Sequence, residues 1–476
     1  MLCFVALDDF TEHCRRVYFA AEDYPPAIFI IVIVGLFYMF QEKIGTASND
    51  DRLDEYKRYS DLCRVNLETA LAHLNLLFPA TKENIEALLI GASWAVEISK
   101  PSLAWQLNIM ASQLCQTLGY HRASTFRDLS PEARDMDNRP ILFWLAYMLD
   151  RGLALRLGRS PTIPDYDITV PREIRHSAIT PEWQEILGMW VKHAEVQGNI
   201  YEKLYSPRAL GEPVEKRVEA ARGLVQEIKV MSTSAHLMRT RLPQRKGLTP
   251  DFNSTTLDML VKSDEVSLLS SLTMVYRAIP PPPGARSTFN MECVESAREA
   301  IQMHLYCMDL LVTSEYLTEA YLHWTILYAP FTPFIVLFCH VIETSNADDV
   351  RRLSGFLGSL QSTSAVSEAV AKLHGICQIL YNVAVLYVDA KAKSQEDQAM
   401  FPIGNEVDMY LSALGFANAP TDEAMAGAGL ENMTPGGAGE MAQAAQLGDW
   451  YSGNRYMMGL LEEDLSQFGQ MNWSGS

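Results

Sequence analysis

The sequence has 476 residues, 48% of them hydrophobic, so the chain can bury a sizeable core. Its formal net charge is −19, and a protein of that sign does not bind nucleic-acid phosphates by itself. Its eight cysteines are scattered, which predicts free thiols in a reducing compartment, and no Cys-x-x-Cys pair gives a zinc-cluster signature.

The hydrophobic pattern is helical almost throughout. An apolar run at residues 27–40 is shorter than the ~20 residues that span a bilayer, so we expect a buried core helix and no membrane contact. Further helices are predicted where apolar residues recur every three or four positions: 56–78, 84–98, 104–118, 140–157, 182–205, 214–231, 256–276, 291–313, 314–343, 350–361 and 366–389. Since no alternating strand series is present, the fold class is all-α.

Turn-forming residues predict the loops and one internal joint. Loops are expected at residues 160–172, 241–253 and 279–286. The proline run in the last of these is a stiff spacer, so a subdomain joint is predicted near residues 277–290. The helical domain is predicted to cover residues 1–395.

Residues 396–476 differ in composition from everything before them. Twelve acidic residues stand against one basic residue, Arg455, and few branched residues are present, so we expect a largely disordered acidic tail. One segment mixes acids with large apolar side chains: Asp449, Trp450, Tyr451, Met457, Leu461, Leu465 and Phe468. This mixture is typical of an activation segment that folds on a coactivator groove. The alternative is a tail whose last helix packs on the domain.

The most informative stretch is the predicted helix at 140–157 and the loop after it. Pro140 suits the first helical position, and Gly158 suits the left-handed residue past the helix end. Asp150 and Arg151 interrupt an otherwise apolar helix, so each needs a partner or an exit to solvent. Asp165 and Asp167, just past the turn, could supply that partner. We predict that the residues of this stretch form one structural motif: Phe143, Trp144, Tyr147, Asp150, Arg151, Gly158, Arg159, Asp165 and Asp167.

A second motif ends the preceding helix. Apolar residues repeat at helical spacing up to Leu118, and Gly119 is expected to stop the helix. His121 and Arg122 follow as polar loop residues. A structural role is favoured for them over anion binding.

These two motifs resemble the regulatory middle homology region of fungal zinc-cluster transcription factors. The resemblance rests on the Phe-Trp-x-x-Tyr-x-x-Asp-Arg core, the Gly-Arg-Ser-Pro turn, the Ile-x-Asp-x-Asp-Ile segment and the Leu-Gly-Tyr-His-Arg helix end. Residues 330–342 and 348–353 resemble later parts of the same region. The resemblance covers roughly residues 1–390.

The resemblance implies an all-helical regulatory domain in the nucleus that controls RNA polymerase II transcription. Coactivators or the transcription machinery would be contacted through the acidic tail. Zinc and DNA are expected only through the family's six-cysteine module, which these residues lack, so this sequence either starts late or belongs to a regulator without its own DNA contact. A homodimer and a small-molecule effector remain open as further partners. Helices around Trp105, Phe143 and Trp144 would line such an effector pocket, although plain core is the favoured reading.

No catalytic residue and no metal ligand is predicted, but an enzyme alternative was weighed. Asp50, Asp51 and Asp54 fit the Asp-Asp-x-x-Asp pattern with which class I terpene synthases hold Mg²⁺ and a prenyl diphosphate, yet the companion motif is missing. His304 with Cys307, and Cys339 with His340, offer too few ligands for a metal site. A loose basic cluster is equally compatible with nuclear import and with a solvated loop: Arg239, Arg241, Arg245 and Lys246.

Overall fold

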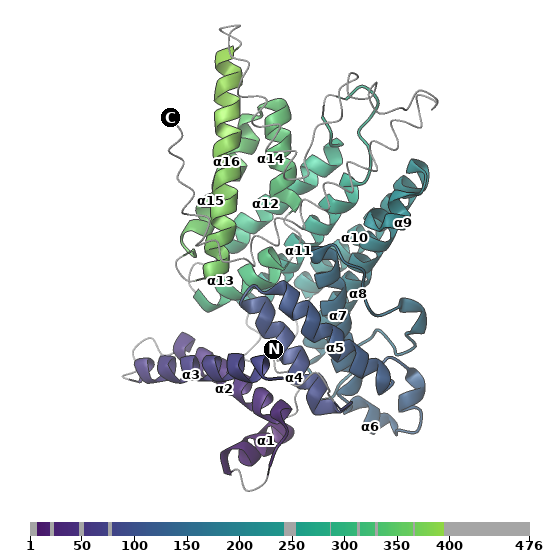
Figure 1. Ribbon diagram of the computed structural model, residues 1–476. Helices are drawn as coiled ribbons and strands as arrows, with labels where there is room; N and C mark the ends of the chain where they lie inside the picture. The colour runs from purple at the N-terminus through teal and green to yellow at the C-terminus, as the bar shows by residue number, and fades with distance from the viewer. Residues whose placement is uncertain are drawn as a thin grey trace. The chain divides into compact units, whose positions relative to one another are not determined.

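The computed structural model describes residues 7–19, 23–46, 52–74, 79–241, 254–285, 287–311, 315–328, 332–364 and 367–394. All secondary structure in these ranges is helical (Figure 1), which confirms the all-α prediction. Several predictions lie outside the described residues: the acidic tail with its activation segment, Asp50 and Asp51, and the basic residues 245 and 246.

The chain divides into two compact units. Unit 1 comprises Met1–Ala154, Pro161–Glu195 and Ser314–Ala320, and unit 2 comprises Leu155–Ser160, Val196–Thr313 and Tyr321–Ser476. Helices wholly within unit 1 are α1 (Leu7–Phe19), α2 (Pro26–Thr46), α3 (Leu53–Ala72), α4 (Lys82–Glu97), α5 (Pro101–Thr117) and α6 (Pro131–Asp135), with short turns η1 (Ala123–Phe126) and η2 (Asp165–Asp167). Three helices cross the division: α7 (Arg139–Leu157), α8 (Pro181–Ile200) and α13 (Glu315–Tyr321).

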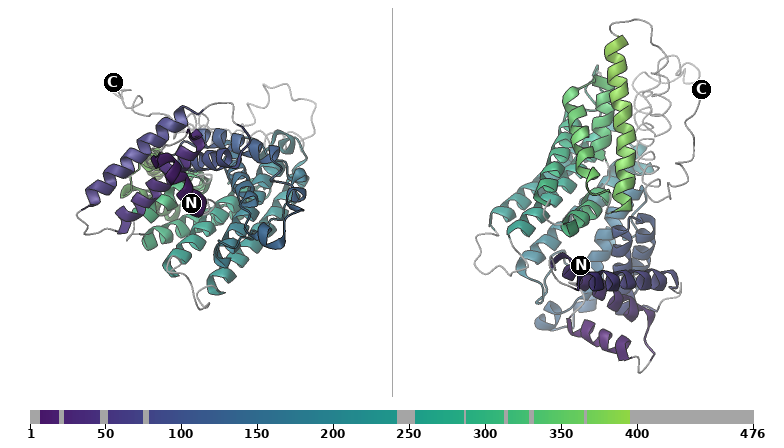
Figure 2. Two further views of the ribbon diagram at one scale, coloured as in Figure 1. Left: turned by 90° about the horizontal axis from the view of Figure 1, so that it is seen from below. Right: turned by 90° about the vertical axis from the view of Figure 1, so that its left-hand side faces the viewer.

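Unit 2 contains the remaining helices. They are α9 (Pro207–Leu210), α10 (Val214–Arg241), α11 (Ser254–Arg277), α12 (Met291–Leu311), α14 (Thr332–Thr344), α15 (Ala347–Gln361) and α16 (Glu368–Ser394), with two π-helical turns, η3 (Tyr201–Tyr205) and η5 (Leu322–Leu327). Helix α11 packs on α10 and α12, and α16 packs on α14 and α15, so these helices lie side by side (Figure 2).

Helix α2 forms the apolar centre of the first three helices. It packs against α1, α3 and α4, and Ile28, Ile30 and Ile31 are at most 1% exposed, which confirms the predicted core helix. The helix is longer than the fourteen-residue run, however. Its residues Pro26–Ile44, like residues Glu368–Ala392 of α16, are long and apolar enough to cross a membrane by length and composition. Polar contacts also tie α2 to its neighbours, since the Tyr38 hydroxyl donates to Glu97 at 2.8 Å and the Gln41 amide donates to Ser60 at 3.0 Å.

Two of the long predicted helices are broken in the structure. The segment 314–343 was predicted as one helix, but it forms α13, η5 and α14. Pro333 lies in the first turn of α14, where backbone N–H groups have no partner within the helix. A proline is therefore tolerated at the start of a helix, and α14 begins as a new helix at this point. The segment 182–205 likewise ends as α8 at Ile200 and continues as the π-helical η3. Helix α10, in contrast, runs ten residues beyond its predicted end at residue 231.

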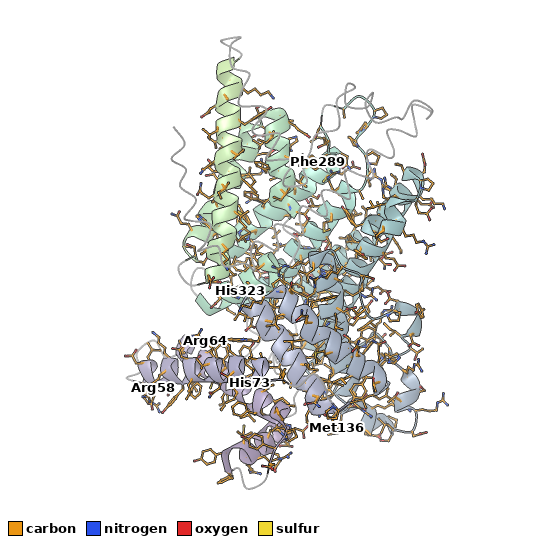
Figure 3. The ribbon with its side chains drawn as sticks, in the orientation of Figure 1. Arg58, Arg64, His73, Met136, Phe289 and His323 are labelled. Atoms are coloured by element: carbon orange, nitrogen blue, oxygen red, sulfur yellow. The ribbon has the colours of Figure 1, made fainter. Side chains whose placement is uncertain are left out.

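The segment with the proline run lies within unit 2. The Asn290 side chain donates to the carbonyl oxygens of Tyr276 and Ile279 at 2.7 and 2.8 Å. The Arg277 guanidinium lies 4.9 Å from the ring centroid of Phe289, which is labelled in Figure 3. The two ends of the segment are therefore tied together, and the subdomain joint stays a prediction.

Candidate regulatory site

Helix α7 carries the central motif, and its two ends set the frame. It begins at Arg139, so Pro140 is its second residue rather than its first. The Arg139 backbone N–H donates to the Asp137 carboxylate at 3.0 Å. At the other end Gly158 has φ +65°, the left-handed conformation predicted for it, and Arg159 follows as a half-buried residue.

Three aromatic residues of α7 form a packed core. Phe143, Trp144 and Tyr147 are at most 1% exposed, and the ring centroids of Trp144 lie 5.0 Å from Phe143 and 5.3 Å from Tyr147. The Trp144 indole N–H donates to the Pro171 carbonyl at 2.9 Å, which ties the end of the following loop to the helix. This burial supports the core reading of these aromatics, with Trp105 half-buried on α5. The effector pocket stays a hypothesis.

Asp150 is fully buried and is satisfied by the loop after α7. Its carboxylate accepts from the Thr162 N–H at 2.9 Å, from the Thr162 hydroxyl at 2.7 Å and from the Ile163 N–H at 3.2 Å. Burial raises the pKa of this carboxyl above its usual range, although these hydrogen bonds and the nearby Arg151 charge oppose the rise. Asp150 therefore fixes the backbone N–H groups of Thr162 and Ile163, which precede the short turn η2 and lie in no helix.

Arg151 holds the next part of the same loop. Its Nη2 donates to the Ile163 carbonyl at 2.5 Å and lies 3.1 Å from Asp165 Oδ2, while the guanidinium carbon lies 4.8 Å from the Tyr147 ring centroid. The Tyr147 hydroxyl donates to the other Asp165 oxygen at 2.8 Å. Burial raises the pKa of Tyr147, so the hydroxyl keeps its proton and remains a donor. Of the two partners that the sequence offered, Asp165 and Asp167, Asp165 is the one that contacts Arg151.

Asp167 serves a different partner, at the end of α5. Gly119 has φ +72°, so the chain turns there as predicted, just after the Leu118 cap. Arg122 Nη2 contacts both Asp167 oxygens at 2.9 and 3.0 Å, and these contacts with His121 nearby hold the pKa of Asp167 below its usual range. The N–H groups of Thr169 and Val170 both donate to the His121 carbonyl, at 2.9 and 3.1 Å.

The two motifs of the sequence therefore meet on one loop. We call the loop residues 162–170, with their partners on α7 and at residues 121–122 just after α5, the helix–loop network. It joins the residues Tyr147, Asp150, Arg151, Asp165, Asp167, His121 and Arg122. Its charged atoms are directed at one another and at the backbone. A fold-stabilising role for the polar residues Asp150, Arg151, Arg159, Asp165 and Asp167 stays a prediction.

A second polar cluster, in unit 2, was not recognised from the sequence. Asp349 of α15 is fully buried and contacts Arg298 of α12 at 2.8 Å through both oxygens. His340 Nδ1 of α14 lies 2.9 Å from Oδ2, and Arg352 Nη1 lies 3.1 Å from Oδ1. Burial alone raises the pKa of Asp349, but the bonds from His340 and Arg298 outweigh it and hold this pKa well below the usual range. We call this group the Asp349 cluster.

The metal-ligand pairs weighed at the sequence level have other roles. His304 bonds with the Tyr321 hydroxyl at 2.9 Å and the Ser359 hydroxyl at 2.8 Å, and Cys307 is buried. Burial lowers the pKa of His304 to about 3, so the ring is neutral. His323, labelled in Figure 3, similarly bonds with Ser367 at 2.8 Å. Among the described residues no group of three or more His, Cys, Asp or Glu side chains is placed to hold a metal ion.

Fold and site together define an all-helical domain in which polar clusters tie loops and helices to one another. Residues 15–183 match the family model of the fungal specific transcription factor domain, and this range includes the whole helix–loop network. The matched residues are thus a fungal specific transcription factor domain, the middle homology region, as the sequence motifs indicated.

Curated relatives are transcriptional regulators. An uncharacterized transcriptional regulatory protein of Schizosaccharomyces pombe is 24% identical over 66% of this chain and 51% of its own length. Protein STB5 of Saccharomyces cerevisiae is 25% identical over 47% of this chain and 32% of its own. An ABC-transporter-regulating transcription factor of Aspergillus oryzae is 21% identical over 66% of this chain and 38% of its own. The matches cover 32–51% of the length of these three relatives, and no solved structure matches the chain.

This family consists of transcription factors, which are not enzymes. The alternative that the chain is a Mg²⁺-dependent prenyl-diphosphate enzyme is therefore rejected. Of its three carboxylates the structure describes only Asp54, which is exposed on α3.

Proposed function

We propose that this chain is the regulatory body of a fungal zinc-cluster transcription factor that acts in the nucleus on RNA polymerase II transcription. The single observation that carries the proposal is the helix–loop network, which joins α7 and residues 121–122, just after α5, to one loop inside the matched region at residues 15–183. In this proposal the helical body holds or releases the acidic tail, and the tail recruits coactivators or the transcription machinery.

DNA contact is assigned to a zinc module outside these residues. A formal charge of −19 and the lack of a Cys-x-x-Cys pair support that division of labour. The same two observations favour a second candidate function: a partner regulator without DNA contact of its own, which acts on related factors through protein–protein interaction.

A tethering experiment tests the proposal. The chain is fused to an unrelated DNA-binding domain and assayed on a reporter gene in a fungal host. We expect activation by the full chain, loss of activation when residues 396–476 are removed, and activation by the tail alone. Activation that survives removal of the tail would contradict the activation segment, and silence of every fusion would contradict the activator reading.

The second candidate is tested without tethering. The untethered chain is expressed beside a full-length relative that drives its own reporter. A fall in that reporter, together with co-purification of the two proteins, would favour the partner regulator. An unchanged reporter would leave the tethered activator as the function.

A further inference from the structure

Helix α16 presents an apolar face that nothing in the described part of the chain covers. Its inner side is core, since Val370, Leu373 and Cys377 are at most 1% exposed. On the opposite side Ile379 and Leu386 are each 65% exposed. Only a third of the apolar window Glu368–Ala392 is buried, compared with 44% of the corresponding window of α2. We define the outer face of α16 as the exposed residues Gly375, Ile379, Asn382 and Leu386.

The uncovered surface grows toward the end of the helix. From residue 385 to residue 392 no side chain is fully buried, although Val385, Leu386, Tyr387 and Val388 are consecutive apolar or aromatic residues. This part of α16 rises beyond α14 in the same unit (Figure 1). Large apolar side chains that stay exposed along one face of a helix are candidates for an interaction site.

We infer that the outer face of α16 binds the tail segment Asp449–Phe468 of the same chain. The proposal rests on the proposed function, because it names the surface on which the body holds the tail. The chain continues for 82 residues after α16, and the segment is joined to α16 through residues 395–448. A tethered segment acts at an effective concentration on the order of millimolar, far above that of a second copy.

The two faces match in length. The apolar tail residues Met457, Leu461, Leu465 and Phe468 recur over eleven positions, as do the four residues of the outer face. As helices, both stripes are about 16 Å long. No Asp, Glu, Lys or Arg occurs between Leu373 and Val388, so the docked stripe of the tail would meet an uncharged surface.

A lipid bilayer is the less favourable occupant of this face. The exposed Asn382 accepts a hydrogen bond from Gln378 at 2.9 Å, and both amides would face the hydrocarbon. In a docked tail they would face side chains with hydroxyl and amide groups, such as Ser466 and Gln467.

Hydrogen exchange on the full-length chain, followed by mass spectrometry, tests the docking in both directions. In the tail variant (Leu461→Ser, Leu465→Ser, Phe468→Ser) the amides of α16 at 385–392 should exchange about tenfold faster than in the parent chain. In the outer-face variant (Ile379→Glu, Leu386→Glu) the tail amides at 457–468 should speed up by a similar factor. A matched control, Leu62→Glu with Val65→Glu, changes two exposed apolar residues of α3 and should leave both segments unchanged.

Three outcomes would overturn the docking. In the first, neither variant alters exchange in the other segment. In the second, the parent chain self-associates and only the outer-face variant abolishes the self-association, which assigns the face to a second copy. In the third, the parent chain floats with phosphatidylcholine–phosphatidylserine vesicles and the outer-face variant does not, which assigns the face to a lipid surface. Reporter assays separate this result from the proposed function. Reciprocal exchange effects without reporter activation would retain the docking and reject the activation segment, whereas docking together with activation predicts higher activity in the outer-face variant.

Discussion

Asp150 in unit 1 and Asp349 in unit 2 are both fully buried carboxylates, and the protein satisfies them in opposite ways. Asp150 accepts mainly from neutral donors, the backbone and hydroxyl of Thr162 and the N–H of Ile163, and its pKa rises. Asp349 is bonded to Arg298 and His340, and its pKa falls. Burial raises the pKa in both cases, so the charge of the partners decides the direction.

The difference reflects what each carboxylate has to fix. Asp150 fixes a loop whose backbone N–H groups need acceptors, and neutral N–H groups are what a loop offers. Asp349 joins three helices, whose backbone groups are largely paired within each helix, so its carboxylate is bonded to side chains of α12, α14 and its own α15. The first arrangement positions a loop, and the second joins helices.

The largest effect is expected from Asp349→Ala. The change leaves the guanidinium of Arg298 without its bidentate partner, so unfolding free energy should fall by about 3–5 kcal/mol. Urea denaturation at pH 7 measures it. The neighbouring Asp348→Ala is the control, because Asp348 is 63% exposed and pairs with Arg351 at the surface, where about 1 kcal/mol or less is at stake. Equal losses in the two variants would show that the Asp349 cluster does not stabilise unit 2.

A smaller loss is expected from Arg151→Ala in the helix–loop network. The variant removes the bond to the Ile163 carbonyl and the contact with Asp165, which is partly exposed, so we expect about 2–3 kcal/mol. Thermal unfolding measures the change, with Arg122→Ala as control because its side chain is 53% exposed. Unchanged thermal stability of Arg151→Ala would refute the buried-pair interpretation.

Gly119→Ala should cost less again. At φ +72° an added Cβ is strained by about 1–2 kcal/mol, and it would lie 2.7 Å from the Thr125 hydroxyl. Gly223→Ala in α10 meets no atom within 4 Å and should stabilise the helix by up to about 1 kcal/mol. Urea denaturation of both variants measures the two effects, because the midpoint should fall for Gly119→Ala and rise for Gly223→Ala. A destabilised Gly223→Ala would contradict the assignment of that region to a regular helix.

The smallest effect expected is a difference in pH slope between the two carboxylates. Since the folded-state pKa of Asp150 is raised, its contribution is greatest below about pH 3.8 and falls as pH rises through the folded pKa. Since the pKa of Asp349 is lowered, its contribution is present above pH 3.8 and is lost below it. Unfolding free energies at a series of pH values for Asp150→Asn and Asp349→Asn should therefore differ from the parent with opposite slopes. If the unfolding free energies of the two variants changed with pH in the same way, the proposed opposite pKa shifts of Asp150 and Asp349 would be refuted.

Local signals in the sequence predicted a large part of the fold and half of the site. The stops at Gly119 and Gly158 follow from the need for a left-handed residue, and both have positive φ. The partner of Arg151 was predictable because Asp165 lies just past the turn that follows α7. The signal for a partner was the charged pair Asp150-Arg151 within an otherwise apolar helix.

The rest depended on contacts between distant parts of the chain. Asp167 pairs with Arg122, 45 residues away, and Asp349 pairs with Arg298, 51 residues away. The spacing of apolar residues along the sequence does not predict contacts between residues so far apart. The break between α13 and α14 was missed because the apolar spacing continues across 314–343. Pro333 was the available signal, and the uninterrupted spacing concealed it.

The apolar window of α2 has a consequence during synthesis of the protein. Its residues Pro26–Ile44 emerge from the ribosome about fifty residues before α4 ends, and α4 provides part of their cover. At roughly 5–20 residues per second this interval lasts a few seconds, in which the nascent chain displays a helix that passes for a membrane span. Nascent-chain chaperones would have to hold this segment until Ser60 and Glu97 arrive to pair with Gln41 and Tyr38. The apolar segment and the residues that cover it are therefore separated in time as well as in sequence.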